Sequence, residues 1–183
     1  MKQSPFDFSQ DCVLKSVCFK SPMIRKATLD DAAAIAEIYN HYIEHTSVSF
    51  EVEPLSPMAM RERMVSLLPH FPYLLYEKDN KVLGYCYAHA WKERAAYKST
   101  WELTIYLHHQ FTGAGIGKQL MRELIAACRA QGCRVLIACI TGNNVASKMF
   151  HQQFGFHQVS HFEKVGEKHG EVLDVDDFEL ILA

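Results

Sequence analysis

The pattern of hydrophobic and polar positions changes its period along the chain, and each change predicts a different element. Segment 99–107 alternates at every second residue, which is typical of a strand with one face in the core. Its apolar face consists of Trp101, Leu103, Ile105 and Leu107, and its other face of Glu102, Thr104 and Tyr106. Segment 116–130 instead repeats its apolar residues at helical spacing. Strand and amphipathic helix are joined by a turn that is rich in glycine.

Elsewhere the period of the apolar positions predicts further helices and strands, and the sequence contains no internal repeats. Thr28 and Asp31 have the spacing of a capping box, and Ser56-Pro57 is typical of a helix start. Helices are expected over 28–45, 57–68, 116–130 and 144–153. Strands are expected over 23–27, 73–77, 82–91, 99–107, 134–140, 156–164 and 171–182. This order predicts an α/β fold with an antiparallel first half and a parallel β-α-β unit in the second.

The glycine-rich turn is a candidate binding site for a phosphate. Glycines let backbone N–H groups approach an anion, and the N-terminus of the following helix favours negative charge. A P-loop is excluded, because Thr112 replaces its first glycine and Gln119 its Ser or Thr. A dinucleotide fingerprint is excluded as well, because Lys118 replaces its third glycine and strand 134–140 ends without an acidic residue. The turn therefore predicts another phosphate-bearing ligand, close to the carboxylate of Glu102.

Length and charge narrow the possible classes of protein. With 183 residues, the chain is expected to form one domain, 23–183, preceded by an extension at 1–22. The net charge of −2 gives no electrostatic reason to expect a nucleic acid or an anionic membrane as partner. No apolar run approaches the roughly 18 residues that a bilayer span requires.

The N-terminal segment and the cysteines indicate a reducing compartment. Residues 1–22 lack the continuous apolar stretch of a signal peptide. None of the six cysteines forms a C-x-x-C pair, and most lie inside apolar runs. They are Cys12, Cys18, Cys86, Cys128, Cys133 and Cys139. We expect reduced, buried cysteines in a cytoplasmic protein, with neither a disulfide framework nor a metal site.

Several segments, taken in order, resemble the GNAT superfamily of acetyl-CoA-dependent N-acetyltransferases, and within it the phosphinothricin N-acetyltransferase group. They are IRKATLDDAAAIAEIYNHYI from Ile24, FEVEP from Phe50, RAAY from Arg94, WELTIYL from Trp101, GAGIG from Gly113, NNVASKMFHQQFGF from Asn143 and VGEKHG from Val165. Counted back from Leu120, Thr112 stands where the superfamily loop usually carries Gln or Arg, which is a departure. In the alternative register, two residues earlier, Gln110, Gly113 and Gly115 fit the loop pattern. The resemblance implies a GNAT fold, with a mixed central sheet, flanking helices and an antiparallel N-terminal half. It also implies that the parallel strands 99–107 and 134–140 splay apart around the acetyl-pantetheine arm of acetyl-CoA.

The resemblance assigns roles in acetyl transfer to three residues. Glu102 matches the glutamate that serves as general base through a water molecule, whereas its spacing alone fits a solvated strand carboxylate equally well. His151 matches a histidine that could pass a proton to the departing sulfur or assist the base, and a packed or capping histidine is the alternative. Asn144 matches an asparagine that contacts the pantetheine arm, and a helix N-cap is an equally plausible role.

Two further groups of residues are expected, by resemblance, to bind the co-substrate and the acceptor. Backbone amides of Ile105, Tyr106 and Leu107 would hold the pantetheine arm and the acetyl carbonyl. Those of Gly113, Ala114, Gly115, Ile116, Gly117 and Lys118 would hold the pyrophosphate. The acceptor pocket would include Phe50, Glu51, Arg94 and Tyr97. An arginine suits a bidentate contact with an α-carboxylate, although a solvated loop cation is the alternative for Arg94.

The leading interpretation is a metal-independent N-acetyltransferase, expected to be a homodimer like others of its group. It would acetylate the α-amine of a small amino-acid-like acceptor, of the phosphinothricin, methionine sulfoximine or methionine sulfone type. An acetyltransferase for protein N-termini or polyamines is one alternative, and Arg94 argues against a polyamine pocket, which should be rich in acidic residues. A non-catalytic acyl-CoA-binding module is the other, and the presence of Glu102 and His151 disfavours it.

Overall fold

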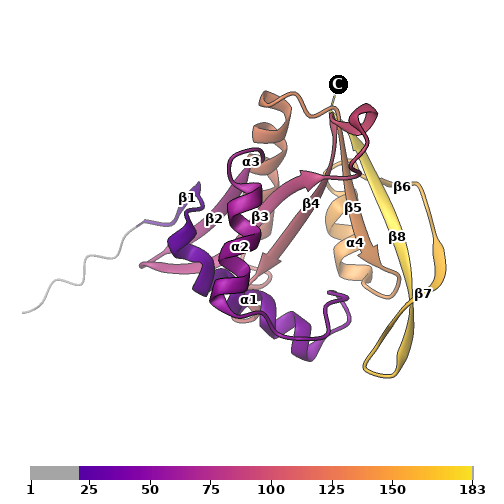
Figure 1. The fold of residues 1–183 in the computed structure, drawn as a ribbon, viewed down its shortest axis with the longest axis horizontal. Coiled ribbons are helices and arrows are strands. Elements are labelled where there is room, and N and C mark those ends of the chain that lie inside the picture. Colours follow the sequence, from indigo (N-terminus) through magenta and orange to yellow (C-terminus); the bar gives the residue numbers. More distant parts are fainter. Residues whose placement is uncertain (1–20, 183) are drawn as a thin grey trace, which may run out of the picture.

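The strands form one mixed sheet that runs through the protein (Figure 1). The computed structural model describes residues 21–182, so the predicted extension 1–22 lies outside it except for its last two positions. The strands are β1 (Met23–Lys26), β2 (Tyr73–Lys78), β3 (Lys81–Ala90), β4 (Thr100–Leu107), β5 (Val135–Thr141), β6 (His157–Gln158), β7 (Phe162–Lys168) and β8 (Glu171–Ile181). The helices are α1 (Ala32–His45), α2 (Pro57–Leu67), α3 (Ile116–Ala130) and α4 (Val145–Gln152), with the short 3-10 turns η1 (Leu29–Asp31), η2 (Ala95–Tyr97) and η3 (His109–Phe111).

The sheet has the mixed topology that the sequence predicts. Its order is β1-β2-β3-β4-β5-β8-β6, and β7 pairs with β8. Strands β1 to β4 are antiparallel neighbours, β4 and β5 are parallel, and β5 and β8 are antiparallel. Within residues 21–182, no helix combines the length and apolar character that a membrane span requires.

Local chemistry sets several element boundaries. The Thr28 N–H donates to the Asp31 carboxylate over 2.7 Å, which completes the predicted capping box in front of α1. Ser56 caps α2 by accepting a hydrogen bond from the Ala59 N–H over 3.1 Å. Gly115, the N-cap of α3, has φ 79°, a backbone conformation that residues with a Cβ rarely adopt. The glycine at this position is therefore explained by the backbone conformation as well as by the close approach of an anion.

One prediction fails near the C-terminus. The single strand expected over 156–164 is two strands, β6 and β7, and β7 continues to Lys168. Lys164 adopts φ 55°, its N–H donates to the Asp174 carboxylate over 2.7 Å, and the β7–β8 register shifts between Phe162 and Gly166. This irregularity does not appear in the alternation of side chains, which is why the sequence pattern misses it.

The helices cover the sheet in two layers. Helices α1 and α2 pack on β2 and β3 through a cluster that includes Ile35, Met64 and Tyr85. Helix α3 packs on the opposite face through Leu120 and Leu124, in a cluster that contains the apolar face of β4. Successive residues of β4 therefore face different layers, as predicted from their alternation.

Strands β4 and β5 separate shortly after they start. Their only paired positions are Thr100–Val135, Trp101–Leu136 and Glu102–Ile137, although both strands continue beyond them. In Figure 1 the two arrows diverge from this common start, which confirms the predicted splay. The central sheet thus contains a gap that begins at Glu102.

A buried ion cluster ties α4 to β8 on the far side of this gap. Asp176 is only 2% exposed, contacts the Lys148 ammonium, and accepts hydrogen bonds from His161 (2.6 Å) and Gln158 (2.9 Å). Burial opposes ionisation of Asp176, but Lys148 and His161 outweigh it and hold the pKa of the carboxyl below its usual value. The cluster therefore fixes the helix that carries Asn144 and His151 relative to the sheet.

We predict that Asp176→Asn lowers the free energy of unfolding by roughly 1.5–3 kcal/mol, because it removes the carboxylate that pairs with the partly buried Lys148 ammonium. Urea denaturation followed by circular dichroism measures this loss. The matched control is Glu171→Gln, another carboxylate of β8 but an exposed one, which should change stability by less than about 0.5 kcal/mol. Equal effects of the two substitutions would contradict an anchoring role for Asp176.

Candidate functional site

The gap between β4 and β5 opens into a cavity of about 700 Å³. Its walls come from both layers of the protein: the sheet face under α1 and α2 contributes Glu102, and helix α4 on the other face contributes His151. Leu103 to Leu107 of β4 and Ala138 to Thr141 of β5 form the two sides. The cavity therefore connects the two faces of the sheet through the gap.

The free edge of β4 presents backbone hydrogen-bonding groups to this cavity. Trp91 donates to the Thr100 carbonyl (3.3 Å) and His108 to the Leu83 carbonyl (2.9 Å), which places the even-numbered residues of β4 in the ladder with β3. Because hydrogen bonding alternates along an antiparallel strand, the N–H groups of Ile105 and Leu107 point the other way, into the gap, whereas the Leu107 carbonyl accepts a hydrogen bond from the Tyr42 hydroxyl over 2.5 Å. Tyr106 pairs with Tyr85, so it contributes its side chain to the cavity rather than its amide.

The glycine turn lies at the end of this edge. The first N–H groups of α3 have no acceptor within the helix, as at any helix start, and its dipole favours an anion there. Thr112 and Gly117 line the cavity, Gly113, Ala114, Gly115 and Lys118 are exposed, and Ile116 is buried in the core. An extended ligand with amide groups and a phosphate end therefore fits the free β4 edge and the turn that follows it.

Glu102 lies where β4 and β5 part. Its side chain is 28% exposed, and its Oε1 is 3.8 Å from Nε2 of His89, the residue that pairs with it on β3. Burial raises the pKa of the Glu102 carboxyl, His89 lowers it and Asp177 raises it further, with a net upward shift. A carboxyl group with a raised pKa beside a cavity is a better proton acceptor than an ordinary surface carboxylate.

Cys139 corrects the expectation of buried cysteines. Cys86, Cys128 and Cys133 are buried, but Cys139 is exposed and lines the cavity on the same sheet face as Glu102. It lies on β5 beyond the last position that pairs with β4. Desolvation, with Glu102 and Asp177 nearby, raises the pKa of its thiol to about 12, so the group is protonated at neutral pH.

His151 lies deep on the α4 side and is 3% exposed. Its Nδ1 is 2.8 Å from the Ser147 carbonyl oxygen, and since a carbonyl only accepts, Nδ1 carries the proton of this hydrogen bond. Burial lowers the pKa of His151, with the Ser147 contact opposing the shift. The ring is therefore neutral, and its buried Nε2 has a free lone pair without a partner. Nearby, Asn144 caps α4 through the Ser147 N–H (3.1 Å) and also lines the cavity, so its two expected roles are compatible.

The segment between α1 and α2 forms the wall opposite the β4 edge. Lys168 is buried and donates from Nζ to the Ser49 carbonyl over 2.6 Å. Phe50 packs on Gly166, where a Cβ would come within 2.2 Å of its ring. The β7–β8 hairpin thus holds Phe50 and Glu51 at the cavity, where both were predicted.

Arg94 and Tyr97 lie outside the cavity. Arg94 is exposed, Tyr97 stacks edge-on against Trp91 with ring centroids 5.2 Å apart, and neither lines the cavity. Their role in binding the acceptor stays a prediction.

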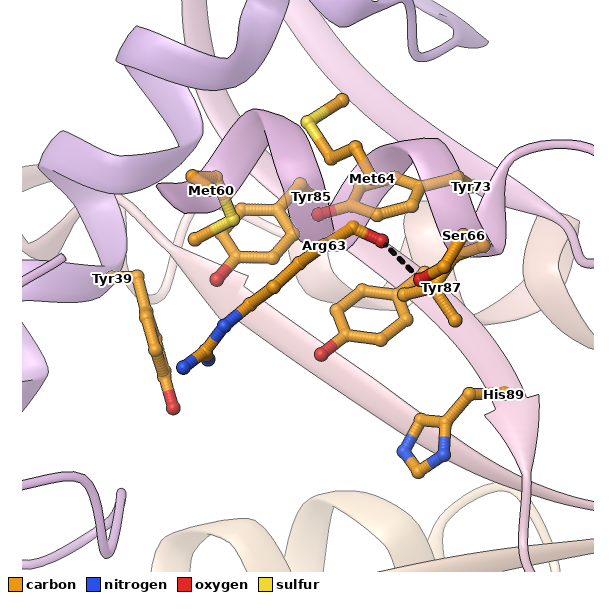
Figure 2. Close-up of a pocket in the computed structure, with 10 residues that line it drawn as sticks. Tyr39, Met60, Arg63, Met64, Ser66, Tyr73, Tyr85, Tyr87 and His89 are labelled. Atoms are coloured by element: carbon orange, nitrogen blue, oxygen red, sulfur yellow. Dashed lines mark hydrogen bonds between the residues drawn. The ribbon is translucent and has the colours of Figure 1, made fainter. Parts of the chain in front are cut away.

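Four further residues of the cavity wall were not predicted from the sequence. Arg63 on α2, Tyr39 on α1, and Tyr87 and His89 on β3 line the main cavity and also a side cavity of about 250 Å³ (Figure 2). The alternation along β3 places Tyr87 and His89 on one face with Tyr85, and this signal could have identified them. Nothing in the sequence around Arg63 separates it from an ordinary surface arginine.

The histidines near the glycine turn do not form a metal centre. His41 stacks on His109 with ring centroids 4.0 Å apart, which brings ring faces rather than nitrogen atoms together. Across the part of the chain that the structure describes, no group of three or more His, Cys, Asp or Glu side chains could hold a metal ion.

Comparison with known proteins places this site in a family. The model of the acetyltransferase (GNAT) domain matches residues 24–175. A phosphinothricin N-acetyltransferase of Streptomyces viridochromogenes is 37% identical, over 86% of this chain and 88% of that protein. An L-methionine sulfoximine/L-methionine sulfone acetyltransferase of Salmonella typhimurium is 33% identical, over 87% and 94%. The crystal structure of a phosphinothricin acetyltransferase from Sinorhizobium meliloti in complex with AcCoA superposes with a TM-score of 0.85 at 32% identity, over 90% of each chain.

These matches agree with the geometry of the gap, which offers main-chain donors and a helix N-terminus in one line. They confirm the predicted enzyme class and acetyl-CoA as its co-substrate. The chain belongs to the GNAT acetyltransferase family, within the group of the phosphinothricin N-acetyltransferases.

Proposed function

We propose that this enzyme transfers the acetyl group of acetyl-CoA directly to the α-amine of a small amino-acid-like acceptor. The observation that carries the proposal is the position of Glu102, at the point where the gap exposes the main-chain N–H groups of Ile105 and Leu107. The reaction forms an N–C bond and breaks the C–S bond. The nitrogen loses one proton before the attack and a second one after it, and of these two protons one ends on the departing thiolate and the other in solvent. Acetyl-CoA supplies the acyl group as a thioester, and the residues of this chain handle the proton and the developing charge.

Glu102 is the proposed base, acting on the acceptor through a water molecule. An ammonium group cannot attack until it loses a proton, and a positioned base contributes roughly 10²–10⁴-fold to such a step. The N–H groups of Ile105 and Leu107 are the proposed donors to the acetyl carbonyl oxygen, where negative charge develops. Asn144 and the glycine turn are the proposed contacts for the pantetheine arm and the pyrophosphate.

His151 is proposed first to accept a hydrogen bond or a proton. In its neutral form, Nδ1–H is held by Ser147 and only the Nε2 lone pair faces a ligand. It can therefore accept a hydrogen bond or take up a proton, and it can protonate the departing sulfur only after that uptake.

Direct transfer is favoured over a covalent acyl-enzyme. Cys139 is the cysteine that lines the cavity, and a thiol with a pKa of about 12 is a poor nucleophile at neutral pH because the thiolate is the reactive form.

The names of the relatives support an amino-acid acceptor. They act, by name, on phosphinothricin and on methionine sulfoximine or sulfone. The cavity carries the cation Arg63 as well as the carboxylates Glu51 and Glu102, which does not suit a polyamine. A panel of amino acids, their analogues, polyamines and N-terminal peptides, assayed by thiol release, tests this; turnover only on peptides or polyamines, or none at all, would overturn it. The homodimer and the cytoplasmic location stay predictions.

We expect Glu102→Gln to lower turnover at least tenfold, because the amide cannot accept the proton and a positioned base contributes roughly 10²–10⁴-fold. Affinity for acetyl-CoA, measured by calorimetry, should change little. Glu123→Gln on the exposed face of α3 is the matched control and should retain full turnover. Unchanged turnover of the Glu102 variant would remove this residue from the role of base.

The rate should fall at low pH as Glu102 becomes protonated. Because its pKa is raised, the acid limb of kcat/KM should lie above the usual range of a carboxylate. A positive charge on His89 lowers that pKa, so His89→Gln should move the limb to higher pH. His157→Gln removes an exposed histidine outside the cavity and should leave the limb in place. A limb that stays or moves to lower pH in the His89 variant would show that His89 does not act on Glu102.

A further inference from the structure

Arg63 occupies a position that the reaction described so far does not use. It lines both the main cavity and the side cavity, and in Figure 2 its guanidinium extends between the rings of Tyr39 and Tyr87. Its Nη1 donates to Oε1 of Glu51 over 2.7 Å. Among the described residues it is the arginine that lines these cavities, and its planar guanidinium matches a carboxylate in a bidentate contact.

The pair that Arg63 forms with Glu51 can be replaced at low cost. The two side chains are 45% and 35% exposed, and ion pairs that are open to solvent contribute little to stability. A carboxylate of a bound molecule could therefore take the place of the Glu51 carboxylate without breaking the fold. Glu51 would then have held the guanidinium in position while the acceptor was absent.

Charges of opposite sign lie along this side of the cavity. Glu102 pairs with His89 on β3, and Arg63 lines the same cavity as both, with its guanidinium extending toward Tyr39 (Figure 2). An amino acid in this cavity can therefore lie with its amine toward Glu102, with a water molecule between them, and with its carboxylate toward Arg63.

We propose that Arg63 binds the carboxylate of the acceptor in exchange for Glu51, and so restricts the enzyme to acceptors that carry an anionic group. This inference rests on the proposed function, whose own failure would appear as absence of turnover on every amino acid. The anionic group is the α-carboxylate or, in a phosphinothricin-like acceptor, the phosphinate. Comparing an amino acid with its carboxamide, for acceptors with and without a phosphinate, distinguishes these sources.

The test compares KM for an accepted amino acid with KM for its carboxamide. Arg63→Gln should raise KM for the acid roughly 10- to 100-fold, the value of a charge-assisted hydrogen bond, and leave KM for the amide nearly unchanged. Glu51→Gln should lower KM for the acid, because the guanidinium no longer has a competing partner. The decisive result is that the two substitutions change KM for the acid in opposite directions, since a purely structural ion pair would be weakened equally by either substitution.

Matched variants keep the test interpretable. Arg61→Gln, on the same helix but outside both cavities, should not change the ratio of the two KM values. Thermal unfolding of each variant shows whether it is folded, and Arg63→Lys, which keeps the charge without the planar fork, should lie between wild type and Arg63→Gln. If Arg94→Gln abolishes discrimination while Arg63→Gln does not, or if Arg63→Gln raises both KM values equally, the proposal is wrong.

Discussion

The loss of pairing between β4 and β5 after Glu102 is the constraint on which the site depends. Backbone N–H and C=O groups inside a protein need partners, so an unpaired edge at the centre of a sheet must be satisfied by water or a ligand. Helices cover both faces of the sheet, and no strand of the described residues pairs with β4 along this part of its edge. The free main-chain N–H groups of Ile105 and Leu107 are therefore available to a narrow, extended molecule, while the Leu107 carbonyl is already bonded to Tyr42.

In the proposed reaction, the two substrates use different faces of the sheet. His151 and Asn144 lie on the face of α3 and α4, together with the glycine turn. Glu102, His89 and Arg63 lie on the face of α1 and α2. Acyl donor and acceptor can thus approach from opposite sides and meet only where the strands part. This separation agrees with direct transfer, because neither substrate has to leave before the other binds.

The sequence predicts the framework of this site better than its acceptor side. The alternation in β4 and the glycines before α3 are local patterns, and the structure confirms both. The position of Arg63 depends on how α2 packs over β3, and that of Cys139 on where β4 leaves β5. Neither position can be predicted from a short segment of the sequence. The division of 156–164 into β6 and β7 depends on a contact between Lys164 and Asp174. The periodic pattern of side chains does not reveal this contact either.

The free edge of β4 has a consequence for how the enzyme can vary. Because its contacts use the peptide backbone, most exchanges of side chain along the strand preserve them, provided that the extended conformation persists. Determinants of this kind escape an alanine scan, and only a change that removes an amide hydrogen or bends the strand, such as proline at position 105, would reveal them. Donor binding and acceptor choice can therefore diverge independently, the first fixed by main-chain geometry and the second adjustable at single side chains.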